Sequence, residues 1–151
     1  MDQKLSPLLV PSAIGSNRLR LSDDILHVHA GGKMDLNAMK QLTTVYEKVI
    51  ARFGYLLLCL DLSQSTGIDP DARRHGAEWG KSVIDVQATA ATGAMLVVRL
   101  FVGLMFRATQ ILGKNATTEM HFADSEAEAV QWLSRQRPRL LAAATQRRQN
   151  Q

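Results

Sequence analysis

The sequence is poor in cysteine and in aromatic residues. Its 151 residues contain one cysteine, Cys59, and aromatic side chains make up 5% of the chain. A single cysteine excludes an internal disulfide framework and a cysteine-rich zinc site. Apolar residues reach 46% and charged residues 21%, which is the composition of an ordinary globular protein and excludes wholesale disorder. The length fits one domain with a sizeable core, and the cytoplasm is the expected compartment.

Acidic residues are absent from the last part of the chain. Residues 135–151 hold five arginines and no Asp or Glu, whereas the rest carries 13 basic and 14 acidic residues. The body is therefore close to neutral, and positive charge is confined to residues 135–151, which we describe as a basic C-terminal tail. Nucleic-acid-binding domains usually spread a basic patch over one face of the fold. We therefore expect no nucleic-acid partner.

The N-terminal residues lack the features of a secretory signal peptide. A short apolar stretch at residues 8–10 is flanked by Pro7 and Pro11, and it has no basic segment in front of a continuous apolar run. Residues 1–16 are predicted to form an extended arm that lies against the rest of the domain.

Strand and helix patterns alternate along residues 17–134. Alternating apolar residues predict strands at 18–21 and 25–30, and Gly31 and Gly32 are expected to end the second. Asp35 opens an amphipathic helix that ends before Gly54. The remaining expected elements are a buried strand at 55–60, a loop at 63–67, a helix that Asp69 caps and Pro70 starts, a strand at 86–92, a helix at 94–112, a strand at 117–122, and a helix that opens with the capping box at 125–128 and ends at Pro138.

This order, β-β-α-β-α-β-α-β-α, predicts an α/β fold. Strands that alternate with helices favour a largely parallel sheet with helices packed on it. The strand at 55–60 is apolar along its whole length, which is typical of a strand buried on both faces. We expect one domain with a four- or five-stranded mixed sheet.

Candidate catalytic and metal-binding groups are few. His27 and His29 share a strand face, as two metal ligands could, but zinc takes three or four ligands, and His75 and His121 lie in unrelated elements. Exposed or half-buried strand histidines are the simpler interpretation. Cys59 lies within an apolar strand and is expected to be an inert core thiol. We predict no metal site, no cofactor and no catalytic activity.

Three acidic residues gather around the loop that follows the buried strand. Asp61, Asp69 and Asp71 could pair as a general acid and base, or they could hold a cation. Helix capping and solvation explain the same residues more simply.

Two segments carry a family resemblance. Residues 58–69 read Leu-Cys-Leu-Asp-Leu-Ser-Gln-Ser-Thr-Gly-Ile-Asp, and residues 125–133, which follow a His-Phe strand end, read Ser-Glu-Ala-Glu-Ala-Val-Gln-Trp-Leu. The first resembles the central strand and following loop of STAS domains, the fold shared by sulfate-transporter tails and anti-sigma-factor antagonists. The second is similar to the closing helix of SpoIIAA-like proteins, a bacterial group of STAS or CRAL-TRIO-like type. The resemblance covers roughly residues 17–134.

The resemblance implies a non-catalytic regulatory module that docks a partner protein. The docking surface is expected at Ser63, Ser65, Thr66, Asp69 and Asp71.

The chain departs from the phosphorylatable antagonists at one position. In those proteins a serine follows the aspartate that starts the helix, whereas here Pro70 and Asp71 follow Asp69. The resemblance therefore implies a module that is not switched by phosphorylation at that position, in which Asp71 could act as a fixed negative charge. The loop hydroxyls upstream could serve a kinase, although solvated hydroxyls are the simpler interpretation.

Residues 94–112 form an unusually apolar segment whose only charges are Arg99 and Arg107. Both arginines argue against a transmembrane span, because each is costly near the bilayer centre. The side of such a helix that faces away from the sheet needs a cover. This cover could be the chain's own arm or tail, a second copy in a homodimer, a hydrophobic ligand, or a membrane surface. Arg99, Phe101, Met105 and Arg107 are the residues expected at that contact.

An alternative function follows from this segment. The protein would be a carrier or sensor of a lipid or other apolar ligand bound beneath residues 94–112, with an arginine pairing with its acidic head. Ala88, Ala90 and Ala91 would form the floor, because their small side chains leave room above the sheet.

Overall fold

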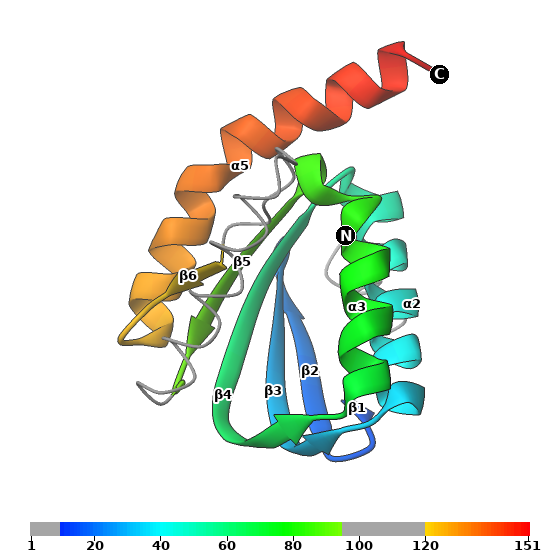
Figure 1. Ribbon diagram of the computed structural model, residues 1–151. Helices are drawn as coiled ribbons and strands as arrows, with labels where there is room; N and C mark the ends of the chain where they lie inside the picture. Colours follow the sequence, from blue (N-terminus) through cyan, green and yellow to red (C-terminus); the bar gives the residue numbers. More distant parts are fainter. Residues whose placement is uncertain (1–9, 95–119) are drawn as a thin grey trace, which may run out of the picture.

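The computed structural model describes residues 10–94 and 120–151, and it shows a six-stranded mixed sheet between helices (Figure 1). The elements in chain order are β1 (Ala13–Ile14), β2 (Asn17–Ser22), β3 (Ile25–Met34), α2 (Leu36–Phe53), β4 (Leu56–Ile68), α3 (Pro70–Lys81), the 3-10 helix η2 (Ile84–Val86), β5 (Gln87–Thr92), β6 (Met120–Phe122) and α5 (Glu126–Gln149). Neighbouring strands follow the chain order; the first two pairs are antiparallel and the last three are parallel. The predicted α/β class and mixed sheet are confirmed. The strand count is six rather than four or five, because residues 13–14 add an edge strand.

Helices cover both faces of the sheet. α5 lies on one face, and α2 and α3 lie on the other (Figure 1). Successive residues of β4 enter opposite sides of the core: Leu57 and Cys59 join the cluster beneath α5, whereas Leu56 and Leu58 join the cluster beneath α2. A strand buried on both faces was the prediction for this segment, and it is confirmed.

Helix α2 begins and ends where its capping residues predict. The Asp35 carboxylate accepts a hydrogen bond of 2.8 Å from the Ala38 amide, which satisfies one of the free amides of the first turn. Gly54 ends α2 in a left-handed conformation, with φ of 88°. Residues 10–14 lie against this side of the sheet, where Val10 and Ile14 are buried.

The long parallel pairing of β3 and β4 corrects two sequence predictions. Gly31 and Gly32 do not end β3, and the predicted loop at 63–67 is part of β4. Pairing continues to Met34 opposite Ile68, with register shifts at the two glycines. Gly32 has a φ of 67°, which glycine adopts without strain, so the strand bends at a bulge instead of ending.

Gly31 is held in close contact with the turn between β1 and β2. An added Cβ at Gly31 would lie 2.2 Å from the Ser16 carbonyl oxygen. The Ser16 hydroxyl donates to the Gly31 carbonyl, and the Gly31 amide donates to Asn17 Oδ1 over 3.1 Å. The buried Asn17 amide group also donates to the Ile14 carbonyl, so this one side chain links β3 to the edge of the sheet.

α5 begins as predicted but does not end at Pro138. The Ser125 hydroxyl accepts from the Glu128 amide over 3.2 Å, and Glu128 Oε2 accepts from the Asp124 amide. The helix then passes through Pro138 and continues to Gln149, so the predicted break there is wrong. An interior proline costs a helix roughly 3 kcal/mol. The burial of Leu140 and Ala144 in the core beneath α5 offsets this cost.

Two arginines of the basic tail bind carboxylates on the body of the domain. Arg137 pairs with Asp24 through Nε to Oδ2 (2.6 Å) and Nη2 to Oδ1 (2.8 Å), and the Tyr55 hydroxyl donates to the same carboxylate. Arg147 holds Asp85 through two nitrogens and also donates to the Ser82 carbonyl. The positive charge of the tail therefore fastens α5 to the sheet. The division of the chain at residues 16 and 134 stays a prediction.

Alanine at position 31 is expected to destabilise the domain by about 1–3 kcal/mol, because its methyl group would collide with the Ser16 carbonyl. The matched control is Gly80→Ala in α3, where an added Cβ meets no atom within 4 Å and alanine favours the helix. Urea unfolding of both variants measures the two effects. Equal unfolding free energies for the two variants would contradict the close packing of Gly31.

The Asp24 carboxylate predicts a pH-dependent contribution to stability. Burial alone would raise the pKa of Asp24, but hydrogen bonds from Arg137 and Tyr55 outweigh it and lower that pKa. A folded pKa below the unfolded value stabilises the fold above pH about 4, and the contribution is lost as the pH falls through the folded pKa.

Asp24→Asn should therefore lower the unfolding free energy by about 1.5–3 kcal/mol at neutral pH. The difference from the wild type should shrink as the pH falls below about 4. Asp23→Asn is the control, because this exposed neighbour has a φ of 55°, a conformation that asparagine tolerates. Denaturant unfolding at several pH values checks the trend, and a difference that stays constant with pH would refute it.

Candidate functional site

The predicted docking residues lie on the second half of β4 and the first turn of α3. We call residues 63–68 the β4 tail. In Figure 1 this part of β4 bends away from the sheet and runs toward α3. Ser63 and Thr66 are exposed, and Ser65 is half-buried. Gly32 pairs with Ser65 and Met34 with Ile68, so these side chains project from a hydrogen-bonded strand rather than from the predicted loop.

The start of α3 is fixed by an ion pair instead of a side-chain cap. Asp69 occupies the capping position, but its side chain makes no capping hydrogen bond. Its carboxylate pairs with Lys33 over 3.0 Å, and its backbone amide donates to the Met34 carbonyl over 2.9 Å. Asp69 is therefore at the predicted capping position, but the prediction that its side chain caps the helix amides is wrong. Asp71 Oδ1 accepts from the Ala72 amide, and the Asp71 side chain is exposed in the first helical turn.

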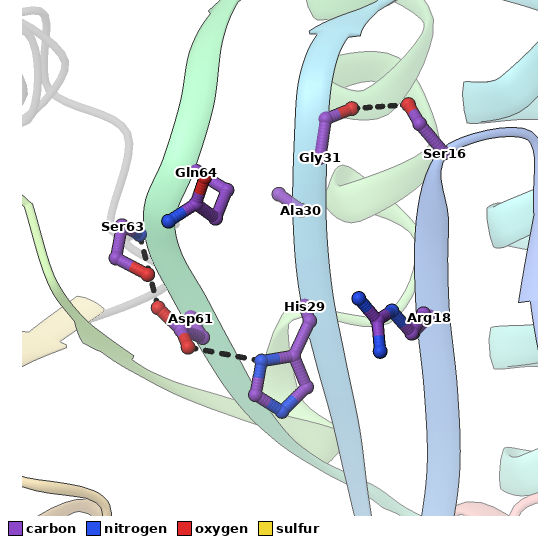
Figure 2. Close-up of a pocket in the computed structure, with 8 residues that line it drawn as sticks. All are labelled: Ser16, Arg18, His29, Ala30, Gly31, Asp61, Ser63 and Gln64. Carbon is purple, nitrogen blue, oxygen red and sulfur yellow. Dashed lines mark hydrogen bonds and ion pairs between the residues drawn. The ribbon is translucent and has the colours of Figure 1, made fainter.

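A pocket of about 220 Å³ lies beside the β4 tail. Its lining comes from β2, β3, β4 and the turn before β2 (Figure 2), and consists of Ser16, Arg18, His29, Ala30, Gly31, Asp61, Ser63 and Gln64. Only Ser63 belongs to the predicted docking residues. Arg18, Ser16 and Gln64 were missed by sequence reasoning.

The pocket contains a row of three charged or ionisable side chains. Arg18 is directly opposite His29 in the antiparallel pair, and His29 is directly opposite Asp61 in the parallel pair. Paired residues of neighbouring strands point to the same face of a sheet. The alternation of residues 27 and 29 indicated a shared face in the sequence, but the partner strands could be identified only from the register.

Asp61 holds the imidazole of His29 in one orientation. His29 Nδ1 lies 2.9 Å from Asp61 Oδ2, and Asp61 Oδ1 accepts from the Ser63 amide over 2.9 Å. Partial burial alone would raise the pKa of Asp61, but the hydrogen bonds of Ser63 and the pairing with His29 lower it. The Ser63 hydroxyl bonds the carboxylate rather than the imidazole, so these side chains do not form the serine–histidine arrangement of a nucleophilic hydrolase.

The other candidate groups from the sequence serve the core and the helices. Cys59 is buried, and burial raises its pKa to about 11, so it behaves as an inert thiol. His27 is buried, with Nδ1 3.0 Å from Glu126 at the start of α5, and its pKa is lowered chiefly by burial. His75 contacts the Thr43 hydroxyl, and His121 stacks on Trp132. Within residues 10–94 and 120–151, no three His, Cys, Asp or Glu side chains form a group able to hold a metal ion.

The predicted ligand or interface residues of the apolar segment, Arg99, Phe101, Met105 and Arg107, lie outside the described residues. Their proposed floor is described. Ala88 and Ala90 are fully buried in the cluster that contains Leu133 and Leu140, so α5 occupies the space above them. Ala91 is also fully buried. No helix within the described ranges is long and apolar enough to cross a membrane.

Comparisons with known proteins bear on the fold. No protein-family model matches the chain, and no curated protein matches it. Among solved structures, the chain is similar to an uncharacterised protein with a SpoIIAA-like fold from Shewanella loihica, with TM-score 0.53 and 20% identity over 78% of this chain and 91% of that chain. It is also similar to a putative anti-sigma factor antagonist from Thermotoga maritima, with TM-score 0.56 and 15% identity over 78% and 94%.

A third similar structure is the anti-sigma factor antagonist SpoIIAA in its unphosphorylated form, with TM-score 0.51 and 11% identity over 79% of this chain and 97% of that chain. The three comparisons each span most of both proteins. The chain therefore has a SpoIIAA-like fold, in agreement with the resemblance to STAS domains in its sequence.

Proposed function

We propose that this STAS-like domain is a non-catalytic module that docks a protein partner through the β4 tail and the first turn of α3. The observation that carries the proposal is Ile68, which is 38% exposed at the end of a hydrogen-bonded strand. Exposed hydroxyls precede it, and the carboxylates of Asp69 and Asp71 follow it. An apolar anchor with a polar rim is typical of a protein interface.

The backbone of this surface is held in place before any partner binds. β4 pairs with β3 up to Ile68, and the Asp69 amide donates to the Met34 carbonyl. The ion pair between Lys33 and Asp69 adds a side-chain link at the same point. A surface that is already ordered loses little conformational entropy on binding, which favours docking of a partner.

The start of α3 supports a module without a phosphorylation switch at the usual position. Pro70 and Asp71 follow Asp69, so no hydroxyl is present there. Asp71 places a carboxylate in the first helical turn, near the positive end of the helix dipole. In the proposed mechanism this permanent negative charge is part of the surface that the partner recognises.

The names of two similar structures support a protein as the partner. One is a putative anti-sigma factor antagonist and the other is the antagonist SpoIIAA. A cytoplasmic location fits the same proposal. Homodimer formation and binding of a lipid or membrane surface were predicted for residues 94–112, nearly all of which lie outside the described residues, and they stay predictions. The packing of Ala88 and Ala90 beneath α5 gives the carrier alternative no support.

Arginine at position 66 is expected to reduce partner recovery at least about tenfold, because a long cation would be placed in the centre of the proposed interface. The matched control is Thr145→Arg, the same substitution at an exposed position of α5. Tagged wild-type and variant chains would be cross-linked in the native host, and the captured proteins would be quantified by mass spectrometry.

A partner enriched by the wild type and by Thr145→Arg, but not by Thr66→Arg, supports the docking surface. Unchanged recovery with Thr66→Arg would refute it, as would a wild-type chain that enriches no protein over an untagged control. Equal unfolding midpoints for the two variants show that the comparison reports binding rather than folding.

A further inference from the structure

The pocket shares Ser63 and Gln64 with the β4 tail, but its charged side chains lie outside the proposed docking surface. Its floor is the row Arg18, His29 and Asp61 on three neighbouring strands, and Figure 2 shows these side chains on one side of the ribbon. Thr66, Ile68 and the first turn of α3 do not line it. The row is therefore a feature of the surface distinct from Thr66, Ile68 and the first turn of α3.

The charged groups at the two ends of the row differ in whether the rest of the fold supplies them with hydrogen-bond partners. Both Asp61 oxygens already accept hydrogen bonds, one from the Ser63 amide and one from His29 Nδ1. Arg18 is exposed, and its side chain has no hydrogen-bond or ion-pair partner among the described residues. A guanidinium offers five N–H donors in a planar fork that matches the oxygens of a carboxylate or phosphate.

His29 also offers a ring nitrogen for ligand binding in this pocket. Its Nδ1 is engaged by Asp61, so its Nε2 is the ring nitrogen left for a ligand. Figure 2 shows the imidazole next to the Arg18 guanidinium. Ser16 and Ser63 add hydroxyl groups to the rim. The lining thus concentrates nitrogen groups around one small volume and leaves its single carboxylate occupied by the protein.

We propose that this pocket binds a small ligand through an oxyanion group, a carboxylate or a phosphate, held by Arg18 with His29 beside it. The volume of about 220 Å³ is below the range of roughly 300–1,000 Å³ that is usual for drug-sized ligands. It suits an acid of a few heavy atoms or the phosphate end of a larger molecule. Asp61 is a positioning residue that orients the imidazole.

The site can be tested with acetate and inorganic phosphate as probes. The full chain, labelled with ¹⁵N, is titrated with each salt at constant ionic strength, with chloride as the reference anion. Saturable shifts are expected at the backbone amides of Ser16, Arg18, Gly31, Ser63 and Gln64. Saturation by acetate alone assigns a carboxylate ligand, and saturation by phosphate alone assigns a phosphate ligand. Either result supports the site.

Arg18→Gln is expected to weaken the affinity at least about tenfold, since a charge-assisted bidentate contact is lost. Arg18→Lys keeps the charge but loses the planar fork, so its affinity should fall between the two. Arg139→Gln removes the same charge from α5 and should bind as the wild type does. Absence of saturable shifts with both probes, or equal affinity in Arg18→Gln, would overturn the proposal.

This result is separate from the docking experiment. Position 66 does not line the pocket, and Arg18 is not part of the β4 tail. Loss of oxyanion binding in Arg18→Gln therefore leaves the docking proposal standing, and loss of partner capture in Thr66→Arg leaves the pocket intact.

Discussion

The parallel pairing between β3 and β4 is the constraint on which the rest of the surface depends. It begins within the core, where Ile25 is opposite Leu57, and it continues to Met34 opposite Ile68. The inner part places His29 beside Asp61 and so forms the floor of the pocket. The outer part carries the hydroxyls of the β4 tail and delivers the chain to Asp69 at the start of α3. Both proposed sites are therefore consequences of one strand pair that does not end at its glycines.

The second structural element of general importance is α5, which closes the core on the opposite side from α2. Its first turn contacts β2 and β3 through Glu126, which lies against Arg20 and His27. Its middle is tied to the β2–β3 turn by Arg137, and its end is tied to the segment before β5 by Arg147. In the sequence, the arginines without neighbouring acids indicated only a basic C-terminal tail. The acids that those arginines need are distant in the chain, at Asp24 and Asp85.

Local signals predicted the parts of the fold that local chemistry determines. Asp35 and Gly54 gave the bounds of α2, and the apolar run after Tyr55 gave the buried half of β4. The β4 tail was missed because Ser-Gln-Ser-Thr-Gly has the composition of a loop, and only pairing with β3 makes it a strand. The predicted helix end at Pro138 was wrong, because burial of the residues after it outweighed the tendency of proline to break a helix. The pocket depends on register across three strands, which periodicity along one strand does not contain.

The position of α5 in the chain also has a consequence for biosynthesis. A ribosome makes every described strand before it makes α5, and the face formed by Ile25, Leu57, Cys59 and Ala88 is apolar. During synthesis this face stays without its helix, while the opposite face can already receive α2 and α3. Among the described elements, the nascent sheet thus has helices for one face only until α5 is made. Completion of the core is a late event, and until then the exposed side is available to chaperones and to unwanted association with other chains.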